Sequence, residues 1–186
     1  YYQFNAYELR TELLSALLPN EGDNPPDFKR SGTGAQAWVL NVLANAYSTS
    51  GQPQRALRLY KIAIEIFRKA GDRKSQYICL GNLAQLAQLP TGNIHDTEIN
   101  LRIYIDYSKE IFEEHQNADG YLELGRLLSY RGAWNEANQS LNRAFFLLDA
   151  YGSRGTNFVS GVRACRAQYF LLKIRDPLKS KISDSQ

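Results

Sequence analysis

Small and hydrophobic residues recur in the second half of the segment 121–150 at alternating steps of four and three residues. The four positions are Ala137, Leu141, Ala144 and Leu148. This spacing places them on one stripe of a helix with about 3.6 residues per turn. Gly132 separates this helix from an earlier one that carries Leu124, Gly125 and Leu128. The pattern therefore predicts two helices joined by a turn.

The same spacing occurs twice earlier in the chain. The matching positions are Ala56, Tyr60, Ala63 and Phe67 in one copy and Thr97, Leu101, Tyr104 and Ser108 in the other. The glycines in the turns before the three second helices are Gly51, Gly92 and Gly132. The small residues of the three first helices, which lie 40 and 41 residues apart, are Ala44, Ala84 and Gly125. Self-similarity at this period, with two helices per unit, predicts an all-α solenoid of antiparallel helix pairs.

Breaks in the pattern set the expected boundaries of the elements. Residues 1–18 are predicted to form a helix that ends before Pro19. Residues 19–34 are rich in Asn, Asp, Gly, Pro and Ser, which predicts a loop that is either functional or merely flexible. The remaining predicted helices are 35–49, 53–70 with Gly71 as its cap, two helices flanking the break at 90–92, the pair around Gly132, and 156–174. The last helix is expected to cover the apolar end of the stack.

Two residues of the pair around Gly132 have a packing interpretation. Gly inside a helix is less stable than Ala by about 1 kcal/mol, so Gly125 is expected to allow close contact between two helices. Trp134, at the start of the second helix, is either a ligand anchor or a wedge between neighbouring repeats. Because aromatic side chains at helix junctions are usually part of the core, the wedge is favoured.

Composition and charge exclude several classes of protein. Among 186 residues, 22 are Lys or Arg and 19 are Asp or Glu, and the charges are interspersed. This mild balance indicates neither a nucleic-acid nor a membrane partner. No apolar run approaches the roughly 18–20 residues that a membrane-spanning helix needs. The absence of Met suggests a segment cut from a longer protein, so that any catalytic module would lie outside it.

The two cysteines, Cys79 and Cys165, lie among apolar residues and form no CxxC pair. They are expected to be reduced and largely buried, and not to form a metal or redox site. No secretory signal peptide is present at the start of the sequence. Both observations favour a cytoplasmic location.

A search for catalytic motifs finds no candidate chemistry. The sequence lacks the phosphate-binding loop G-x-x-x-x-G-K-[ST], and GTGAQAW has no Lys at the required place. His95 and His115 are expected on one helix, which continues past the apolar Phe112, and at twenty residues apart they are too distant to share a metal. The acidic run at 110–114 is expected to be a solvated helix face. We therefore expect no catalytic residues, no metal and no cofactor, and no enzyme activity.

The fixed positions of the repeat resemble those of the tetratricopeptide repeat (TPR), whose pattern is W-x2-L-G-x2-Y…A-x3-F. The matching residues are Leu43, Ala44, Tyr47, Gly51, Ala56, Tyr60 and Ala63 in one copy and Leu124, Gly125, Leu128, Gly132, Ala137, Leu141 and Ala144 in another. The period here exceeds the usual length of about 34 residues. The resemblance implies a right-handed superhelix.

Elongated repeats of this kind resemble the sensor regions of bacterial STAND-type NTPases, in which a helical array follows a nucleotide-binding module. The segments that carry the resemblance are AYELRTELLSALLP, AWVLNVLANAYSTSGQPQRAL, GNLAQLAQLPTG and YLELGRLLSYRGAWNEA. The expected organisation is one TPR-like domain over 1–186, with the second helix of a truncated repeat at 1–18, a loop at 19–34, repeats at 35–71, 72–116 and 117–151, a capping helix at 155–175 and a tail at 176–186.

The resemblance also implies where a partner binds. In stacked helix pairs the first helices line a concave surface that holds a protein or peptide ligand. Applied position by position, the TPR pattern puts these residues on or beside that surface: Trp38, Asn41, Asn45, Asn82, Gln85, Arg126, Tyr130, Arg163 and Arg166. Amides can both donate to and accept from a peptide backbone, and Arg can pair with a carboxylate. The alternative for each residue is a solvated polar surface.

Co-chaperones with such repeats hold a partner's C-terminal carboxylate with a set of Lys, Arg and Asn residues. Asn45 and Asn82 match that set, but Asn41 stands where a Lys is expected and Asp119 has the opposite charge. The sequence therefore argues against chaperone-tail binding.

Three functions remain open. The leading hypothesis is the ligand-sensing array of a signalling STAND-type NTPase, in which a docked protein shifts the array against an NTPase module of the same full-length chain. The second is a stand-alone scaffold or adaptor. The third is a peptide-binding transcription regulator.

Overall fold

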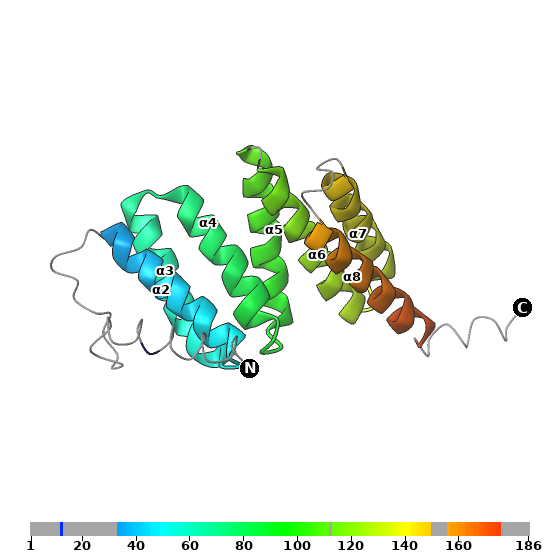
Figure 1. Ribbon diagram of the computed structural model, residues 1–186, viewed down its shortest axis with the longest axis horizontal. Coiled ribbons are helices and arrows are strands. Elements are labelled where there is room, and N and C mark those ends of the chain that lie inside the picture. The colour runs from blue at the N-terminus through cyan, green and yellow to red at the C-terminus, as the bar shows by residue number, and fades with distance from the viewer. Residues whose placement is uncertain (1–11, 13–32, 112, 150–155, 176–186) are drawn as a thin grey trace, which may run out of the picture. The chain divides into compact units, whose positions relative to one another are not determined.

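The computed structural model describes residue 12 and residues 33–111, 113–149 and 156–175 (Figure 1). Within these ranges it contains seven α-helices, one π-helical segment and no strand. The elements are α2 Thr33–Thr49, α3 Pro53–Ala70, α4 Arg73–Asn82, η1 Leu83–Gln88, α5 Ile94–Glu110, α6 Glu114–Tyr130, α7 Trp134–Asp149 and α8 Thr156–Ile174. The all-α prediction is confirmed. The helix predicted at 1–18, most of the loop at 19–34 and the tail at 176–186 lie outside the described residues.

The chain divides into two compact units, residues 1–100 and residues 101–186, with the boundary inside α5. Each unit is described separately below. The organisation as a single domain stays a prediction.

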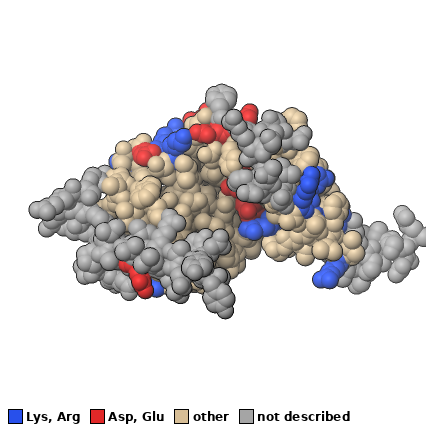
Figure 2. All heavy atoms as spheres, viewed as in Figure 1, with Lys and Arg blue, Asp and Glu red and all other residues tan. Residues whose placement is uncertain are grey.

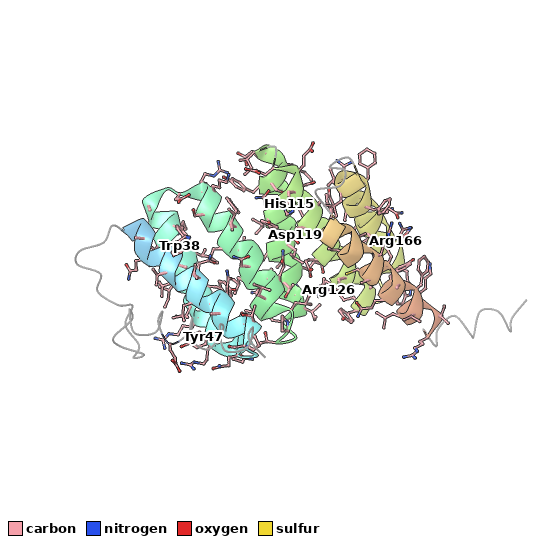
Figure 3. All side chains as sticks on the ribbon, viewed as in Figure 1. Trp38, Tyr47, His115, Asp119, Arg126 and Arg166 are labelled. Atoms are coloured by element: carbon pink, nitrogen blue, oxygen red, sulfur yellow. The ribbon has the colours of Figure 1, made fainter. Side chains whose placement is uncertain are left out.

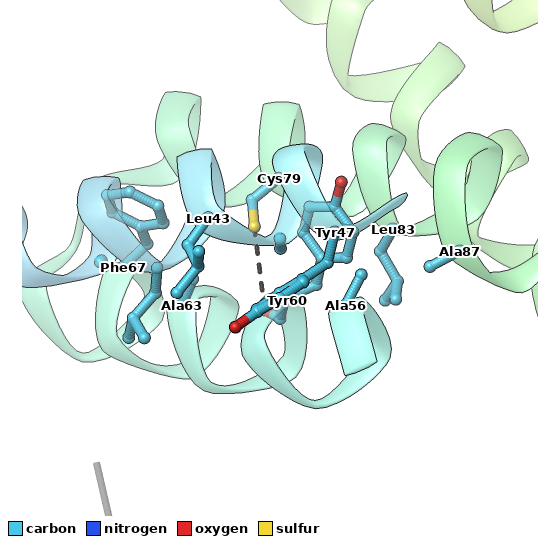
Figure 4. Close-up of a cluster of buried hydrophobic side chains, with 12 residues drawn as sticks. Leu43, Tyr47, Ala56, Tyr60, Ala63, Phe67, Cys79, Leu83 and Ala87 are labelled. Atoms are coloured by element: carbon cyan, nitrogen blue, oxygen red, sulfur yellow. Dashed lines mark hydrogen bonds between the residues drawn. The ribbon is translucent and has the colours of Figure 1, made fainter. Parts of the chain in front are cut away.

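In the first unit, helices α2 and α3 pack against each other and against the α4–η1 segment. The stripe predicted for the second helix is confirmed, because Ala56, Tyr60, Ala63 and Phe67 are the buried residues of α3. Figure 4 shows these side chains in a cluster with residues of α2, α4 and η1. The burial of apolar surface, which contributes about 25 cal/mol of stabilising free energy per Å², holds the helices together.

Local signals explain where these helices begin and end. Pro53 suits the first turn of α3 because that position needs no backbone N–H donor. Gly71 ends α3 with φ of 72°, a left-handed conformation that costs other residues about 1 kcal/mol or more. The carboxylate of Asp72 then accepts a hydrogen bond from the Ser75 backbone N–H at 3.0 Å and caps α4. The predicted turns at Gly51, Gly92 and Gly132 are confirmed by their positive φ angles.

In the second unit, α6 and α7 pack closely and α8 contacts both. The predicted stripe of α7 is confirmed, since Ala137, Leu141, Ala144 and Leu148 are all buried. A Cβ atom on Gly125 would lie 2.7 Å from Cγ of Leu141, which confirms that this glycine permits close contact. The Trp134 ring meets the Tyr169 ring of α8 edge-on, with centroids 5.9 Å apart. This contact agrees with the interpretation of Trp134 as a wedge.

The boundary between α5 and α6 differs from the prediction. Helix α5 ends at Glu110 and α6 begins at Glu114, earlier than the expected repeat start at 117. The expectation that His95 and His115 share one helix is therefore wrong, because they lie in α5 and α6. The turn contains neither Gly nor Pro, so the usual signals of a helix end are absent. A hydrogen bond from the Glu113 N–H to the Ser108 carbonyl, 2.9 Å long, closes the turn instead.

The helix after Asp72 also departs from a regular α-helix. Residues Leu83–Gln88 form the π-helical segment η1, in which the Leu89 N–H donates to the Ala84 carbonyl at 3.0 Å. The buried amide oxygen of Gln88 accepts a hydrogen bond from Asn100 at 2.8 Å. Wide turns of this kind often occur at functional sites.

None of the described helices combines the length and the apolar character that crossing a membrane requires.

Candidate interaction surface

Helix α2 presents a face on which Trp38, Asn41 and Asn45 follow at steps of three and four residues. The Trp38 side chain is 59% exposed (Figure 3). The Asn82 side-chain amide, at the end of α4, donates to Oδ1 of Asn41 at 3.2 Å. This bond joins amide groups from the first helices of two successive pairs. We call Trp38, Asn41, Asn82 and Gln85 the amide face.

Asn45 has a role inside the protein. Its Oδ1 accepts a hydrogen bond from the hydroxyl of Tyr60 at 2.6 Å. The Tyr60 side chain is fully buried, and this burial raises the pKa of the phenol far above its ordinary value. A buried hydroxyl without a partner is destabilising by about 1–3 kcal/mol. Asn45 therefore stabilises the α2–α3 contact whatever else it binds.

Gln85 is half-buried within η1 and already takes part in an interaction with another residue of the chain. Its place in the π-helical segment could not be predicted from the sequence. The wide turn shifts the phase of the following residues relative to a regular α-helix. The TPR pattern assumes a regular α-helix, so it does not give the helical phase of Gln85 and of the residues that follow it in η1.

The predicted residues of the second unit do not all face one another. Tyr130, at the end of α6, is 53% exposed and its hydroxyl accepts from the Gln168 amide at 2.6 Å. The guanidinium of Arg166, which is labelled in Figure 3, instead lies 5.7 Å above the ring of Phe145 on α7. Arg163 is exposed. Gln168 is thus the α8 residue beside Tyr130, and the sequence analysis missed it. The sequence signal that could have found Gln168 is its position around the helix relative to the buried residues Val162 and Tyr169.

Arg126 pairs with a buried carboxylate that the sequence analysis also missed. Its Nη2 atom lies 2.5 Å from Oε2 of Glu123, whose side chain is only 14% exposed. Burial raises the pKa of Glu123 to about 7, while Arg126 opposes this shift and Asp119 adds to it. The Nε atom of Arg126 is buried and has no hydrogen-bond partner among the described residues. A Glu in a helix ordinarily points to solvent, so the sequence contains no direct signal of this burial.

Both cysteines are free thiols. Burial raises the pKa of Cys79 to about 12, and its Sγ lies 3.8 Å from the Tyr60 carbonyl oxygen, which makes it a poor nucleophile (Figure 4). Cys165 is half-buried rather than fully buried, and burial raises its pKa as well. In the described part of the chain no group of three or more His, Cys, Asp or Glu residues is placed to hold a metal ion.

The nine predicted partner-binding residues therefore fall into two sets. Trp38, Asn41, Asn45, Asn82 and Gln85 belong to the first unit, where hydrogen bonds link Asn41 to Asn82 and Asn45 to Tyr60. Arg126, Tyr130, Arg163 and Arg166 belong to the second unit, where Arg126 pairs with Glu123, Tyr130 with Gln168 and Arg166 with the Phe145 ring.

Comparison with solved structures identifies the architecture. The crystal structure of TPR-like repeats from a putative kinesin light chain of Podospora anserina is similar to this chain, with a TM-score of 0.63 and 18% identity. The alignment covers 89% of this chain and 90% of that one. The fold is TPR-like.

A variant of the same Podospora repeats gives a TM-score of 0.64 and 16% identity over 97% of this chain and 83% of that one. Neither a scan against protein-family models nor a search of curated proteins finds a match. At these identities the likeness is one of fold. The TPR-like helix pairs expected from the sequence are confirmed.

Proposed function

We propose that this TPR-like domain is a protein-interaction module that binds an extended peptide segment of a partner on the amide face of its first unit. The observation that supports this is the Asn41–Asn82 hydrogen bond beside the exposed Trp38. The bond holds two amides from successive helix pairs in a fixed arrangement. An aromatic ring that is 59% exposed is then available to cover a partner side chain.

The amide groups suit a peptide backbone because each has both a donor and an acceptor. An extended strand exposes N–H and C=O groups at regular intervals, and amides can pair with them whatever the peptide's side chains are. The half-buried position of Asn41 and Asn82 limits competition from water. Such a surface gives affinity through the peptide backbone and selectivity through the contact with the exposed Trp38 ring.

The experiment that tests this proposal is a selection of random peptides displayed on phage against the full 186-residue chain. The selected peptides are then synthesised, and their Kd is measured by fluorescence anisotropy against the Trp38→Ala variant. We expect affinity to fall at least about tenfold, because exposed aromatic anchors dominate interface energies. The melting temperature should hardly change, since exposed side chains contribute within about 0.5 kcal/mol.

Phe146→Ala is the matched control, because Phe146 is an aromatic residue that is 64% exposed on α7 in the other unit. It should leave the peptide affinity unchanged. Equal affinity of the wild type and Trp38→Ala would remove the amide face as the binding site. Asn45→Ala and Arg126→Ala are unsuitable for this test, because they disrupt the contacts to Tyr60 and Glu123 and so alter stability.

We further propose that the domain is the sensor region of a signalling STAND-type NTPase, on the basis of the sequence resemblance alone. A stand-alone scaffold is the alternative, and both functions use the same binding surface. The sequence encoded upstream of Tyr1 distinguishes them. A phosphate-binding loop there supports the sensor role, and a protein composed of repeats throughout contradicts it.

A further inference from the structure

Helix α8 has apolar residues on two opposite sides. Val162 and Tyr169 are buried against the second unit, as expected for a helix that packs on α6 and α7. On the other side, Phe170, Leu171 and Ile174 are 51%, 59% and 81% exposed. An apolar side of a helix is normally covered by another element. Large exposed apolar side chains that adjoin one another mark an interaction surface.

The exposed side has the pattern of a helix-packing stripe. Arg163, Ala167, Phe170 and Ile174 follow at steps of four, three and four residues, and all four are exposed. Ala164 and Leu171 flank them. The small residues, near the middle of the helix, permit close approach of another helix, and the large ones fill the space next to it. We call these six residues the α8 face.

All the charged residues of this helix and of its last turn are basic. From Thr156 to Arg175 the chain contains Arg163, Arg166, Lys173 and Arg175 and no Asp or Glu. Arg163 and Arg175 are exposed at the two ends of the α8 face. None of the four cations forms an ion pair with another described residue, although Lys173 donates to the Tyr169 hydroxyl at 2.9 Å. Figure 2 shows blue Lys and Arg atoms and no red ones at the C-terminal end of the described chain.

The first helices of the other pairs indicate which kind of element packs against a helix such as α8. Each of α2 and α6 is packed against the second helix of its own pair, α3 and α7. Helix α8 occupies the place of a first helix, and its main contacts among the described elements are with α6 and α7. Its exposed side is thus open to one more antiparallel helix.

We propose that the α8 face binds an amphipathic helix of a partner protein whose apolar stripe is flanked by Asp and Glu. The apolar residues supply the contact area, and the acidic residues pair with Arg163 and Arg175. A second copy of this chain is a poorer occupant, because two α8 faces would bring like charges together. This surface is distinct from the amide face of the first unit.

The test uses a display library of helix-forming peptides about as long as α8, selected against the full chain. The selected peptides should have apolar residues at i, i+3, i+4 and i+7 and should be enriched in Asp and Glu. We expect Leu171→Ser combined with Ile174→Ser to weaken their binding at least about tenfold in Kd. Arg163→Glu combined with Arg175→Glu should weaken it similarly and should favour synthetic copies in which Lys replaces the acidic residues.

Trp38→Ala is the matched control and should not change the Kd of these helices. Circular dichroism melting shows whether each variant is folded, and the charge-reversal pair, which leaves the apolar contacts intact, is decisive if the Ser variant unfolds. Selected helices without acidic enrichment, or the absence of any selected helix, would overturn the proposal. So would a dimer that forms in the wild type and is lost on charge reversal, because the occupant would then be a second copy.

Discussion

At the scale of single residues, Glu123 has a carboxyl group in a place where burial opposes its charge. Arg126 on the same helix offsets part of this effect, whereas Asp119 increases it. Burial, and after it the charge of Glu123, raises the pKa of Cys165 on α8. The net result for Glu123 is a pKa raised to about 7, so the group is neutral in the folded protein at pH 5 and charged at pH 8. This makes stability depend on pH near neutrality.

The direction in which stability changes with pH follows from the difference in the pKa of Glu123 between the folded and unfolded states. A carboxyl group whose pKa is higher in the folded state than in the unfolded state, where it is about 4.5, favours folding most at low pH. That contribution is lost as the pH rises from 4.5 to 7. We expect Glu123→Gln to stabilise the protein at pH 8 by about 1–3 kcal/mol and to have little effect at pH 4. Urea unfolding at a series of pH values measures the difference.

Glu65 supplies a control with the opposite sign. A hydrogen bond from Arg68 lowers the pKa of this exposed carboxyl group to about 2, so its contribution is lost only as the pH falls below 4.5. Glu65→Gln should therefore alter the stability profile in the acidic range and leave it unchanged between pH 5 and 8. Parallel profiles for the wild type and Glu123→Gln above pH 5 would contradict the assignment.

At the scale of elements, the close approach of α6 to α7 depends on Gly125. A Cβ atom there would lie 2.7 Å from Cγ and 2.8 Å from Cδ2 of Leu141, and 3.2 Å from its backbone nitrogen. Leu141 is buried and cannot easily move away. The packing of α6 on α7 therefore selects a residue that helix propensity alone would disfavour.

Gly125→Ala is expected to lower the free energy of unfolding by about 1–3 kcal/mol, because overpacking outweighs the gain in helix propensity. Chemical denaturation monitored by circular dichroism measures this change. Gly161→Ala is the matched control, since its Cβ would meet only Cδ2 of Leu122, at an ordinary 3.7 Å. That variant should instead be stabilised by about 0.5–1 kcal/mol. An equal effect of the two substitutions would contradict the close-packing argument.

At the scale of the whole molecule, the chain contains two compact units whose boundary falls within α5. In repeat proteins each helix pair contacts mainly its neighbours, so stability is nearly a sum of local terms. A destabilising change in one unit should then act most strongly on that unit. Local opening in such proteins occurs in cooperative segments.

Hydrogen exchange of the Gly125→Ala variant tests this expectation. Amide exchange in α6 and α7 should be faster than in the wild type, whereas exchange in α2 and α3 should change much less. Mass spectrometry of peptic fragments gives the rate for each helix. A uniform acceleration over both units would mean that the whole chain opens as one cooperative structure.

The sequence predicted the helix pairs because their signals are local. Alternating steps of four and three residues identify the buried stripe of a helix, and the glycines at 51, 71, 92 and 132 end or connect helices with positive φ angles. The polar residue Thr97 is also buried at its predicted position on the stripe. Its burial is tolerated because its hydroxyl donates a hydrogen bond to the nearby Asn93 carbonyl at 2.6 Å. The TPR-like fold follows from repetition of these signals.

The tertiary structure alone decided features that depend on which side chains meet. The turn after Glu110 contains no Gly or Pro, and no residue type distinguishes the π-helical segment from an ordinary α-helix. Neither feature could therefore be predicted. The hydrogen bond between Asn45 and Tyr60, and the burial of Glu123, likewise join residues whose separate identities give no sign of the contact. Periodicity determines which face of a helix is buried. Only packing determines what each polar residue on the other faces touches.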